Sequence, residues 1–311
     1  MNKKKFKNIL VVLGGTSGER AISLESGKAC IKALKKIKYN VSSFDPKKKN
    51  FNLINKSKTD AIFNALHGKD GEDGVAQSYF EYLKIPYTHS GVISSFNAMD
   101  KLISKKIFLK HKIKTPKYFS IDRNYKISSV DKMLKLKKIY YPVIVKPVNE
   151  GSSLGVELCK NKRTLIKSIK KLVNKYDRAM IEQYISGQEI QVAIINGRPL
   201  GAIELIPKRE FYDYKAKYTK SAKTKHIMPA RLPKLKYLEV LKIAKKTHDA
   251  FKCRGVTRAD FKFFKNNFYL LEINTQPGMT GLSLVPEIAN YKGVNFEQLV
   301  EKILLDASIN K

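Results

Sequence analysis

Two apolar runs near the carboxyl end of the chain, joined by a short polar stretch, restrict the fold more than any other feature. Residues 256–264 and 268–274 flank Lys-Asn-Asn at 265–267, which is the pattern of a β-hairpin. We expect a three-residue turn centred on Asn266. Because side chains alternate between the faces of a strand pair, one face is then wholly apolar and must be buried. It holds Ala259, Phe261, Phe263, Tyr269, Leu271 and Ile273.

The other face of this hairpin gathers polar side chains. The same register places Asp260 opposite Glu272 and Arg258 opposite Asn274, although a β-bulge can displace it locally. Two facing carboxylates repel each other unless a cation lies between them. Ligands that are only carboxylate and amide oxygens favour Mg²⁺ or Mn²⁺. The hairpin therefore predicts a divalent metal site at Asp260, Glu272 and Asn274, with an incidental, solvated acid pair as the alternative.

The first 95 residues have the pattern of a small parallel α/β domain. Apolar runs at residues 8–13, 40–44 and 61–66 predict three strands, and a helix is expected after the first of them. Ligands of such sheets bind beyond the carboxyl ends of the strands. The segments that leave strands at this edge are the glycine loop with Glu19, residues 14–19, and the loop that begins at His67, residues 67–74.

The middle of the chain predicts a second group of helices and strands. Apolar residues at helical spacing predict one helix over residues 94–111 and another over 163–176. Residues 141–147 form an apolar run bracketed by prolines, which favours a strand with short or edge pairing. Asn196-Gly197 predicts a tight hairpin turn. Further strands are expected at residues 179–184, 189–195 and 199–206.

Magnesium held by carboxylates usually also binds substrate phosphates, so we expect the chain to contain a nucleotide-binding site. It has no P-loop motif, and its glycines at 14–18 lack the dinucleotide spacing. Lys146 ends a strand and points toward the glycine-serine loop at 151–155, where it can contact phosphate or simply reach solvent. Glu182 and Glu189 either bind ribose hydroxyls or only decorate their strands.

Residues 210–229 have no periodicity and are rich in Tyr and Lys. An irregular loop of this length inside a compact domain is often a functional lid. We therefore expect this segment to cover a binding site.

The charge of the chain raises the question of a nucleic-acid partner. Lys and Arg total 61 against 27 acidic residues, a net +34, but only nine of the 61 are Arg. Arg is the residue that binds phosphate and guanine through two parallel hydrogen bonds, and the lysines are scattered along expected helix faces. We expect a solvated surface and no nucleic-acid partner.

The chain also lacks the features of a membrane or secreted protein. The longest apolar runs fall short of the ~18 residues needed to span a bilayer. Cys30, Cys159 and Cys253 are odd in number and far apart, which is typical of reduced core thiols. These features predict a cytoplasmic protein without a membrane partner.

Several motifs stand in order along nearly the whole chain. They include the glycine loop with Glu19, Met-Asp-Lys ending at Lys101, Val-Ile-Val-Lys-Pro around Lys146, and Glu-Gly-Ser-Ser at 150–153. The remaining motifs are residues 65–68, 71–74, 211–214, 216–218 and 271–280. Together they resemble the D-alanine–D-alanine ligases of the ATP-grasp superfamily.

The resemblance implies an ATP-grasp fold preceded by a Rossmann-like parallel α/β domain, with α+β character in the carboxyl-terminal half. It implies an N-terminal substrate-binding domain at residues 1–95, a central ATP-grasp subdomain at 96–183 and a C-terminal subdomain at 184–311. ATP would bind between the last two, and a homodimer is expected by analogy.

The resemblance also assigns roles to individual residues. Asp260, Glu272 and Asn274 would bind two Mg²⁺ or Mn²⁺, which agrees with the face predicted from the hairpin. Lys217 would meet the transferred phosphate, and Arg258 with the N–H of Gly278 would stabilise an oxyanion. The other residues would contact ATP (Lys101, Lys146, Glu182, Gln183, Tyr184 and Glu189), the first D-alanine (Glu19 with Ser152 and Tyr218, and His67) or the second (Ser283 and Leu284).

The implied activity is ATP-dependent ligation of two D-alanine molecules through an acyl phosphate, for peptidoglycan precursor synthesis. Many relatives carry Lys-Trp where this chain has Gln183-Tyr184, which leaves its adenine contacts open. The alternative is an ATP-grasp ligase with another acceptor, D-lactate or D-serine. Tyr218 resembles the dipeptide-forming type and argues against that alternative.

Overall fold

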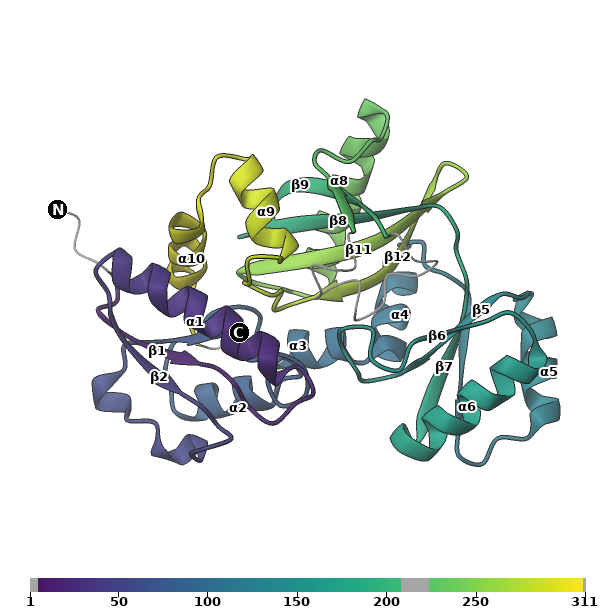
Figure 1. Ribbon diagram of the computed structural model, residues 1–311, viewed down its shortest axis with the longest axis horizontal. Helices are drawn as coiled ribbons and strands as arrows, with labels where there is room; N and C mark the ends of the chain where they lie inside the picture. The colour runs from purple at the N-terminus through teal and green to yellow at the C-terminus, as the bar shows by residue number, and fades with distance from the viewer. Residues whose placement is uncertain (1–4, 208–223, 310–311) are drawn as a thin grey trace.

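The computed structural model describes residues 5–207 and 224–309, which form three β-sheets covered by helices (Figure 1). The N-terminal sheet is parallel, with strand order β2-β1-β3. A four-stranded sheet, β4-β7-β5-β6, and a five-stranded sheet, β10-β9-β8-β11-β12, are both antiparallel. The parallel and the four-stranded sheets lie at opposite ends of the molecule, with the five-stranded sheet between them. This arrangement confirms the expected mixed α/β chain with an α+β carboxyl-terminal half.

The parallel sheet brings the predicted binding loops to one edge. β1 (Asn8–Val12) pairs with β2 (Asn40–Phe44) and β3 (Ala61–Asn64), close to the predicted strands. α1 (Arg20–Lys36) begins directly after the glycine loop and buries one apolar face. α2 (Val75–Tyr82) follows the loop that begins at His67. Two short 3₁₀ helices, Phe51–Leu53 and Lys56–Lys58, precede β3.

The end of the chain completes the core of this N-terminal unit. α9 (Leu284–Tyr291) and α10 (Phe296–Leu305) come from the carboxyl end, and α10 lies beside α1 (Figure 1). One hydrophobic cluster combines residues of β1 and α1 with Val285, Leu299 and Ile303. The packing of α9 and α10 therefore ties the loop after β12 to the first part of the chain.

The predicted helix over residues 94–111 is wrong, because two helices occupy this segment. α3 (Val92–Met99) ends and α4 (Lys101–Lys110) begins at Asp100, which has an extended backbone. The Asp100 carboxylate accepts hydrogen bonds from the N–H groups of Leu102 and Ile103, at 2.8 and 2.9 Å. An aspartate whose side chain accepts from the first N–H groups of the following segment acts as a helix N-cap. It therefore starts a new helix and interrupts the apolar periodicity.

The four-stranded sheet consists of β4 (Tyr118–Asp122), β7 (Arg178–Gln183), β5 (Val143–Pro147) and β6 (Glu157–Cys159). α5 (Ile127–Lys137) and α6 (Lys162–Tyr176) bury their apolar faces in one cluster with it. β5 lies inside the sheet, but β6 pairs with it over only three residues. This agrees with the short pairing predicted from its flanking prolines.

The five-stranded sheet contains β8 (Gln188–Ile195), β9 (Arg198–Ile206), β10 (Lys225–Ile227), β11 (Val256–Phe264) and β12 (Asn267–Asn274). α8 (Lys234–Ala250) packs on it. The predicted turn at Asn196-Gly197 joins β8 to β9, and both of its residues have positive φ. β10 lies within residues 210–229, where only a loop was expected, and most of the predicted lid lies outside the described residues.

The hairpin of β11 and β12 has the predicted facing pairs near the site but not the predicted turn. Asp260 faces Glu272 and Arg258 faces Asn274, as expected. The turn has two residues, Lys265 and Asn266, both with positive φ, and a register shift after Asp260 restores the pairing.

This bulge changes which residues of β12 face the core. Phe268 and Leu270 are buried there, whereas Tyr269 and Leu271, which were predicted on the apolar face, are only partly buried. The prediction is wrong for these two residues because the turn is one residue shorter than expected. Between the turn and the bulge, the side chains of β12 therefore point to the opposite face from the predicted one.

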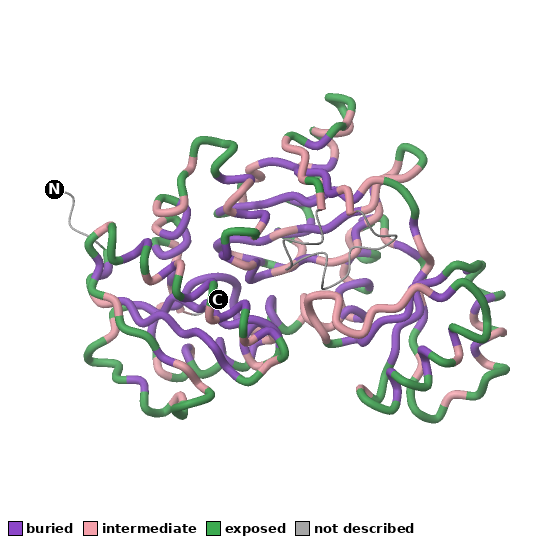
Figure 2. The backbone as a smooth tube through the Cα atoms, viewed as in Figure 1, coloured by how far each residue is buried: buried purple, intermediate pink, exposed green. Residues whose placement is uncertain are grey.

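Burial follows the sheets, with exposed residues on the outer helices and connections (Figure 2). The three cysteines are buried and free, as predicted. The lysines expected on exposed helix faces are exposed, for example Lys36, Lys171 and Lys245. Among the described residues, no helix is long and apolar enough to cross a membrane.

Candidate active site

Two cavities meet where the three sheets come together. The first, of about 660 Å³, is lined by loops of the N-terminal unit and by the ends of β11 and β12. The second, of about 770 Å³, lies between the four-stranded and five-stranded sheets. Lys101, Glu150 and Glu272 line both cavities, so a ligand that extends from one to the other passes these three side chains.

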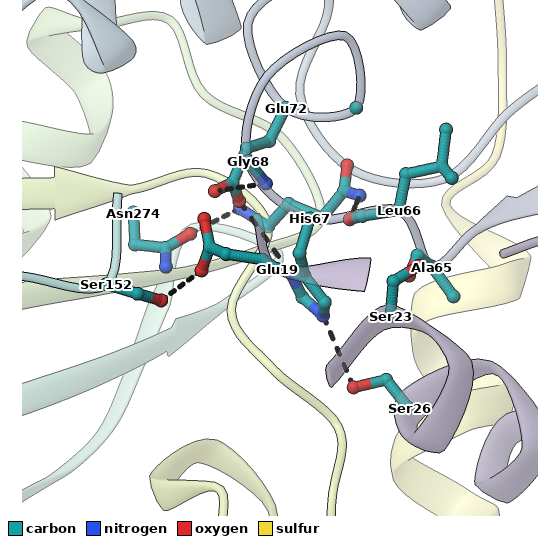
Figure 3. Close-up of polar contacts among 12 residues, drawn as sticks. Glu19, Ser23, Ser26, Ala65, Leu66, His67, Gly68, Glu72, Ser152 and Asn274 are labelled. Carbon is teal, nitrogen blue, oxygen red and sulfur yellow. Dashed lines mark hydrogen bonds and ion pairs between the residues drawn. The ribbon is translucent and has the colours of Figure 1, made fainter. Parts of the chain in front are cut away.

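The first cavity is built around the buried carboxylate of Glu19, which directly precedes α1. Ser152, from the loop between β5 and β6, donates a hydrogen bond to it (Figure 3). A Cβ atom at either Gly68 or Gly151 would lie 2.7 Å from an oxygen of Glu19. A side chain at either position would displace this carboxylate, and the positive φ of Gly68 also favours glycine there. An anionic pocket of this kind suits an ammonium group.

His67 and Glu72 form a second polar group in this cavity (Figure 3). His67 Nε2 lies 3.2 Å from the hydroxyl of Ser26, and its Nδ1 lies 3.9 Å from Glu72 Oε2. The other oxygen of Glu72 accepts from the N–H of Gly68 at 3.0 Å. Glu72 was not predicted as a site residue, although it belongs to the Gly-Glu-Asp-Gly motif at residues 71–74.

The loop after β12 is anchored to the N-terminal unit. The side chain of Gln276 donates to the carbonyl of Leu66 and accepts from Asn64 at 2.9 Å. The N–H of Met279 donates to the hydroxyl of Ser26 at 3.1 Å. These buried contacts hold the carboxyl end of the metal-site hairpin against the first cavity.

The acidic face of the hairpin forms the wall between the two cavities. Asp260 is 4% exposed, and both of its oxygens accept from Arg258, at 2.8 and 3.0 Å. Asn274 faces Arg258 across the strands, and its side-chain oxygen accepts from the N–H of Gln276 at 2.8 Å. The predicted juxtaposition of Arg258, Asp260, Glu272 and Asn274 is therefore present.

These side chains fit a hard divalent cation that also binds phosphate. The described residues contain no cluster of three or more His, Cys, Asp and Glu placed to hold a metal by themselves. Two carboxylates and one amide oxygen match the way Mg²⁺ is held, with substrate phosphates and water as its other ligands. Asp260 offers about four lone-pair sites, and the two bonds from Arg258 use one on each oxygen.

A buried carboxylate in the wall of the second cavity is paired with two lysines, one of which lines the cavity. Glu182 on β7 is 3% exposed, and one oxygen lies 2.7 Å from Lys146 Nζ while the other forms an ion pair with Lys105. Burial alone would raise the pKa of Glu182, but the two ammonium groups outweigh it and lower the pKa. Glu182 is therefore ionised at neutral pH and forms ion pairs with both lysines.

Lys105 is a component of this group that the sequence reasoning missed. It lies one helical turn after Lys101 on α4, and its side chain is fully buried. Burial lowers its pKa to about 8, and Glu182 acts in the opposite direction by favouring the charged form. The available signal was its spacing from Lys101, which places both on one helix face.

The remaining predicted nucleotide residues also line the second cavity. Gln183 and Tyr184 follow Glu182, and Glu189 is paired with Lys262 of the neighbouring strand at 2.9 Å. The structure adds Lys262 and Leu271 to the predicted set, because the hairpin bulge brings Leu271 into this wall.

The predicted second-substrate residues lie at the start of α9. Ser283 caps the loop by accepting from the N–H of Thr280 at 2.9 Å, and a Cβ at Gly278 would lie 2.8 Å from its hydroxyl. Gly278 lines the first cavity, whereas the side chain of Leu284 is buried in the core shared with the N-terminal unit. Lys217 and Tyr218 lie outside the described residues.

A parallel α/β unit, followed by two antiparallel sheets that enclose a cavity lined by lysines and facing acids, defines an ATP-grasp ligase. Residues 107–305 match the family model described as the D-Ala–D-Ala ligase C-terminus. The chain is 54% identical to the D-alanine–D-alanine ligase of Pelagibacter ubique, over 98% of this chain and 99% of that protein.

Solved structures agree with this result. The D-alanine–D-alanine ligase of Bacillus anthracis complexed with ATP has a TM-score of 0.83 and 32% identity, over 96% of this chain and 97% of the other. The VanG D-Ala:D-Ser ligase of Enterococcus faecalis has a TM-score of 0.82 and 26% identity, over 96% and 98%. The chain belongs to the D-alanine–D-alanine ligase family. The resemblance and the ATP-grasp fold inferred from the motifs are thus confirmed.

Proposed function

We propose that the two cavities and the acidic hairpin between them carry out the ATP-dependent ligation of two D-alanine molecules. The activity is that of a D-alanine–D-alanine ligase, an ADP-forming enzyme of peptidoglycan synthesis. The observation that carries the proposal is the position of Asp260 and Glu272, which face each other at the junction of an ammonium-binding cavity and a nucleotide-sized cavity.

The chemistry requires a carboxylate to be activated before an amine can attack it. A carboxylate oxygen of the first D-alanine attacks the γ-phosphorus of ATP, which gives an acyl phosphate and ADP. The amine of the second D-alanine then attacks the carbonyl carbon, and inorganic phosphate leaves with one oxygen of the original carboxylate. Water has to be excluded, because it would hydrolyse the acyl phosphate.

The phosphate-binding residues are proposed to be Lys101 and Lys146, which line the second cavity from α4 and β5. Asp260, Glu272 and Asn274 are proposed to hold two Mg²⁺ or Mn²⁺. Bound there, these ions would neutralise phosphate charge and act as Lewis acids. Contacts to the adenine and ribose are assigned to Glu182, Gln183, Tyr184 and Glu189.

The first D-alanine is proposed to place its ammonium group on Glu19, with Ser152 holding that carboxylate and His67 lining the site. The second D-alanine is assigned to Ser283 and Leu284. Arg258 and the N–H of Gly278 line the first cavity, where they can stabilise the tetrahedral oxyanion. Lys217, assigned to the transferred phosphate, and Tyr218, assigned to the network with Glu19 and Ser152, lie outside the described residues.

The direct test is product formation by the full-length protein. With ATP, Mg²⁺ and D-alanine, we expect D-alanyl-D-alanine together with equal amounts of ADP and phosphate, detected by chromatography and mass spectrometry. D-lactate and D-serine are offered in parallel as competing acceptors. If no dipeptide forms while either competitor is consumed, the protein is a ligase with another acceptor.

The compartment, the oligomeric state and the domain division of the enzyme are also proposed. Free, buried cysteines are typical of a reducing compartment, which supports a cytoplasmic enzyme. A homodimer is proposed by analogy with the family, and analytical ultracentrifugation measures it. The division at residues 95 and 183 is likewise proposed, and limited proteolysis near these positions tests it.

A further inference from the structure

Lys105 is a buried cation that has no assigned role in the proposed ligase mechanism. Its side chain is fully buried and lines neither of the two cavities. Its ammonium group forms an ion pair with Glu182 and lies 2.5 Å from the hydroxyl of Thr115 and 3.5 Å from the carbonyl of Leu270. Leu270 belongs to β12, so Lys105 joins the two sheets that enclose the nucleotide cavity.

Glu182 thus has a separate lysine at each oxygen. Lys146 is 2.7 Å from Oε2 and lines the cavity, whereas Lys105 is held at Oε1 on the side away from it. A phosphate that enters the cavity can reach only Lys146 of the two. Glu182 and such a phosphate compete for the ammonium group of Lys146, which has three N–H donors.

We infer that Lys105 is a positioning residue that keeps Glu182 neutralised, so that Lys146 is released to bind phosphate. The inference rests on the proposed function, in which Lys146 contacts ATP. A buried carboxylate that loses its last cationic partner is strongly destabilised. Without Lys105, Glu182 would have Lys146 as its nearest cation and would hold it away from the phosphate.

The test measures binding of two ligands that differ only in their phosphates. ADP with Mg²⁺, and adenosine, are titrated into the full-length protein by calorimetry. We expect Lys105→Met to weaken ADP binding about tenfold while adenosine binding changes less than twofold. The matched control is Lys106→Met, an exposed neighbour on the same helix, which should alter neither. The inference is overturned if Lys105→Met weakens the binding of both ligands equally, or if it does not weaken ADP binding.

A second variant separates this role from simple packing. In Lys105→Met/Glu182→Gln no carboxylate is left to retain Lys146. ADP affinity should then lie within threefold of that of Glu182→Gln alone. If Lys105 only fills space, the double variant should bind ADP about tenfold more weakly than Glu182→Gln alone. This comparison also decides the matter if Lys105→Met by itself fails to fold.

The outcome is distinguishable from failure of the proposed function. If the unmodified protein does not bind ADP with Mg²⁺, the nucleotide site itself is wrongly assigned. If it binds ADP and Lys105→Met binds it equally well, the site stands and only the role of Lys105 is refuted.

Discussion

In the proposed mechanism, Glu272 is the residue on which both halves of the reaction depend. It faces Asp260 across the hairpin and lines both cavities. Glu272→Gln keeps the shape of the side chain but removes the charge that a divalent ion needs. We expect kcat/KM to fall at least about 100-fold, or about 2.7 kcal/mol of transition-state stabilisation.

The assay for this variant is ADP release in the presence of D-alanine and Mg²⁺. Glu25→Gln, which removes an exposed carboxylate of α1, serves as the control and should keep full activity. Full activity of Glu272→Gln would refute its role as a metal ligand.

An ion pair directly after the glycine loop contributes to the stability of the fold. Arg20 pairs with Asp45 at 2.7 Å, and hydrogen bonds from Arg20 are the main cause that lowers the pKa of Asp45 from 3.8 to about 2. Because the folded-state pKa is below the unfolded one, this pair stabilises the fold above about pH 4. The stabilisation is lost as the pH falls toward 2.

Asp45→Asn should therefore lower the free energy of unfolding by about 1–2 kcal/mol at pH 7. Urea denaturation of both proteins at pH 7 and pH 3 measures this difference, which should shrink at the lower pH. A constant difference at both pH values would show that the charge of Asp45 does not contribute.

At this scale, the sequence predicted the residues that follow from strand alternation and failed for those that depend on packing. Asp260 and Glu272 face each other as predicted, but through a two-residue turn and a bulge in place of the predicted three-residue turn. Lys105 was missed because a lysine at helical spacing is usually solvated, and only the tertiary fold brings Glu182 to it.

The element that shapes the wall between the cavities is the bulged hairpin. Its two-residue turn places Leu270 in the core, and the bulge turns Leu271 toward the nucleotide cavity. Leu270→Ala should cost about 2–5 kcal/mol of unfolding free energy, as expected for a fully buried leucine. Leu271→Ala should cost less and should weaken ADP binding instead.

Urea denaturation and ADP titration of the two variants test this assignment, and each variant is the control for the other. The reverse result, a larger stability loss for Leu271→Ala, would support the regular register with a three-residue turn.

Elements defined by long apolar patterns were predictable, and their interruptions were not. The strands of the parallel sheet and the Asn196-Gly197 turn were found from local pattern alone. The break at Asp100 depends on one side chain that caps the next helix, and the bulge after Asp260 accompanies a turn one residue shorter than the predicted one.

On the scale of the whole molecule, the charge of +34 does not indicate a nucleic-acid partner. Within the described residues, exposed lysines are distributed over separate helices, among them α1, α6 and α8. We expect negligible retention of DNA or RNA at physiological salt in filter binding. Tight binding that falls steeply with added salt would contradict this expectation.

The central claim is that the molecule activates a carboxylate as an acyl phosphate at the junction of its cavities. D-alanine labelled with ¹⁸O in both carboxylate oxygens tests this claim most directly when it is incubated with ATP and Mg²⁺. We predict inorganic phosphate that carries one ¹⁸O atom, formed together with ADP and dipeptide. Label in AMP with release of pyrophosphate, or dipeptide formed with unlabelled phosphate, would contradict the account.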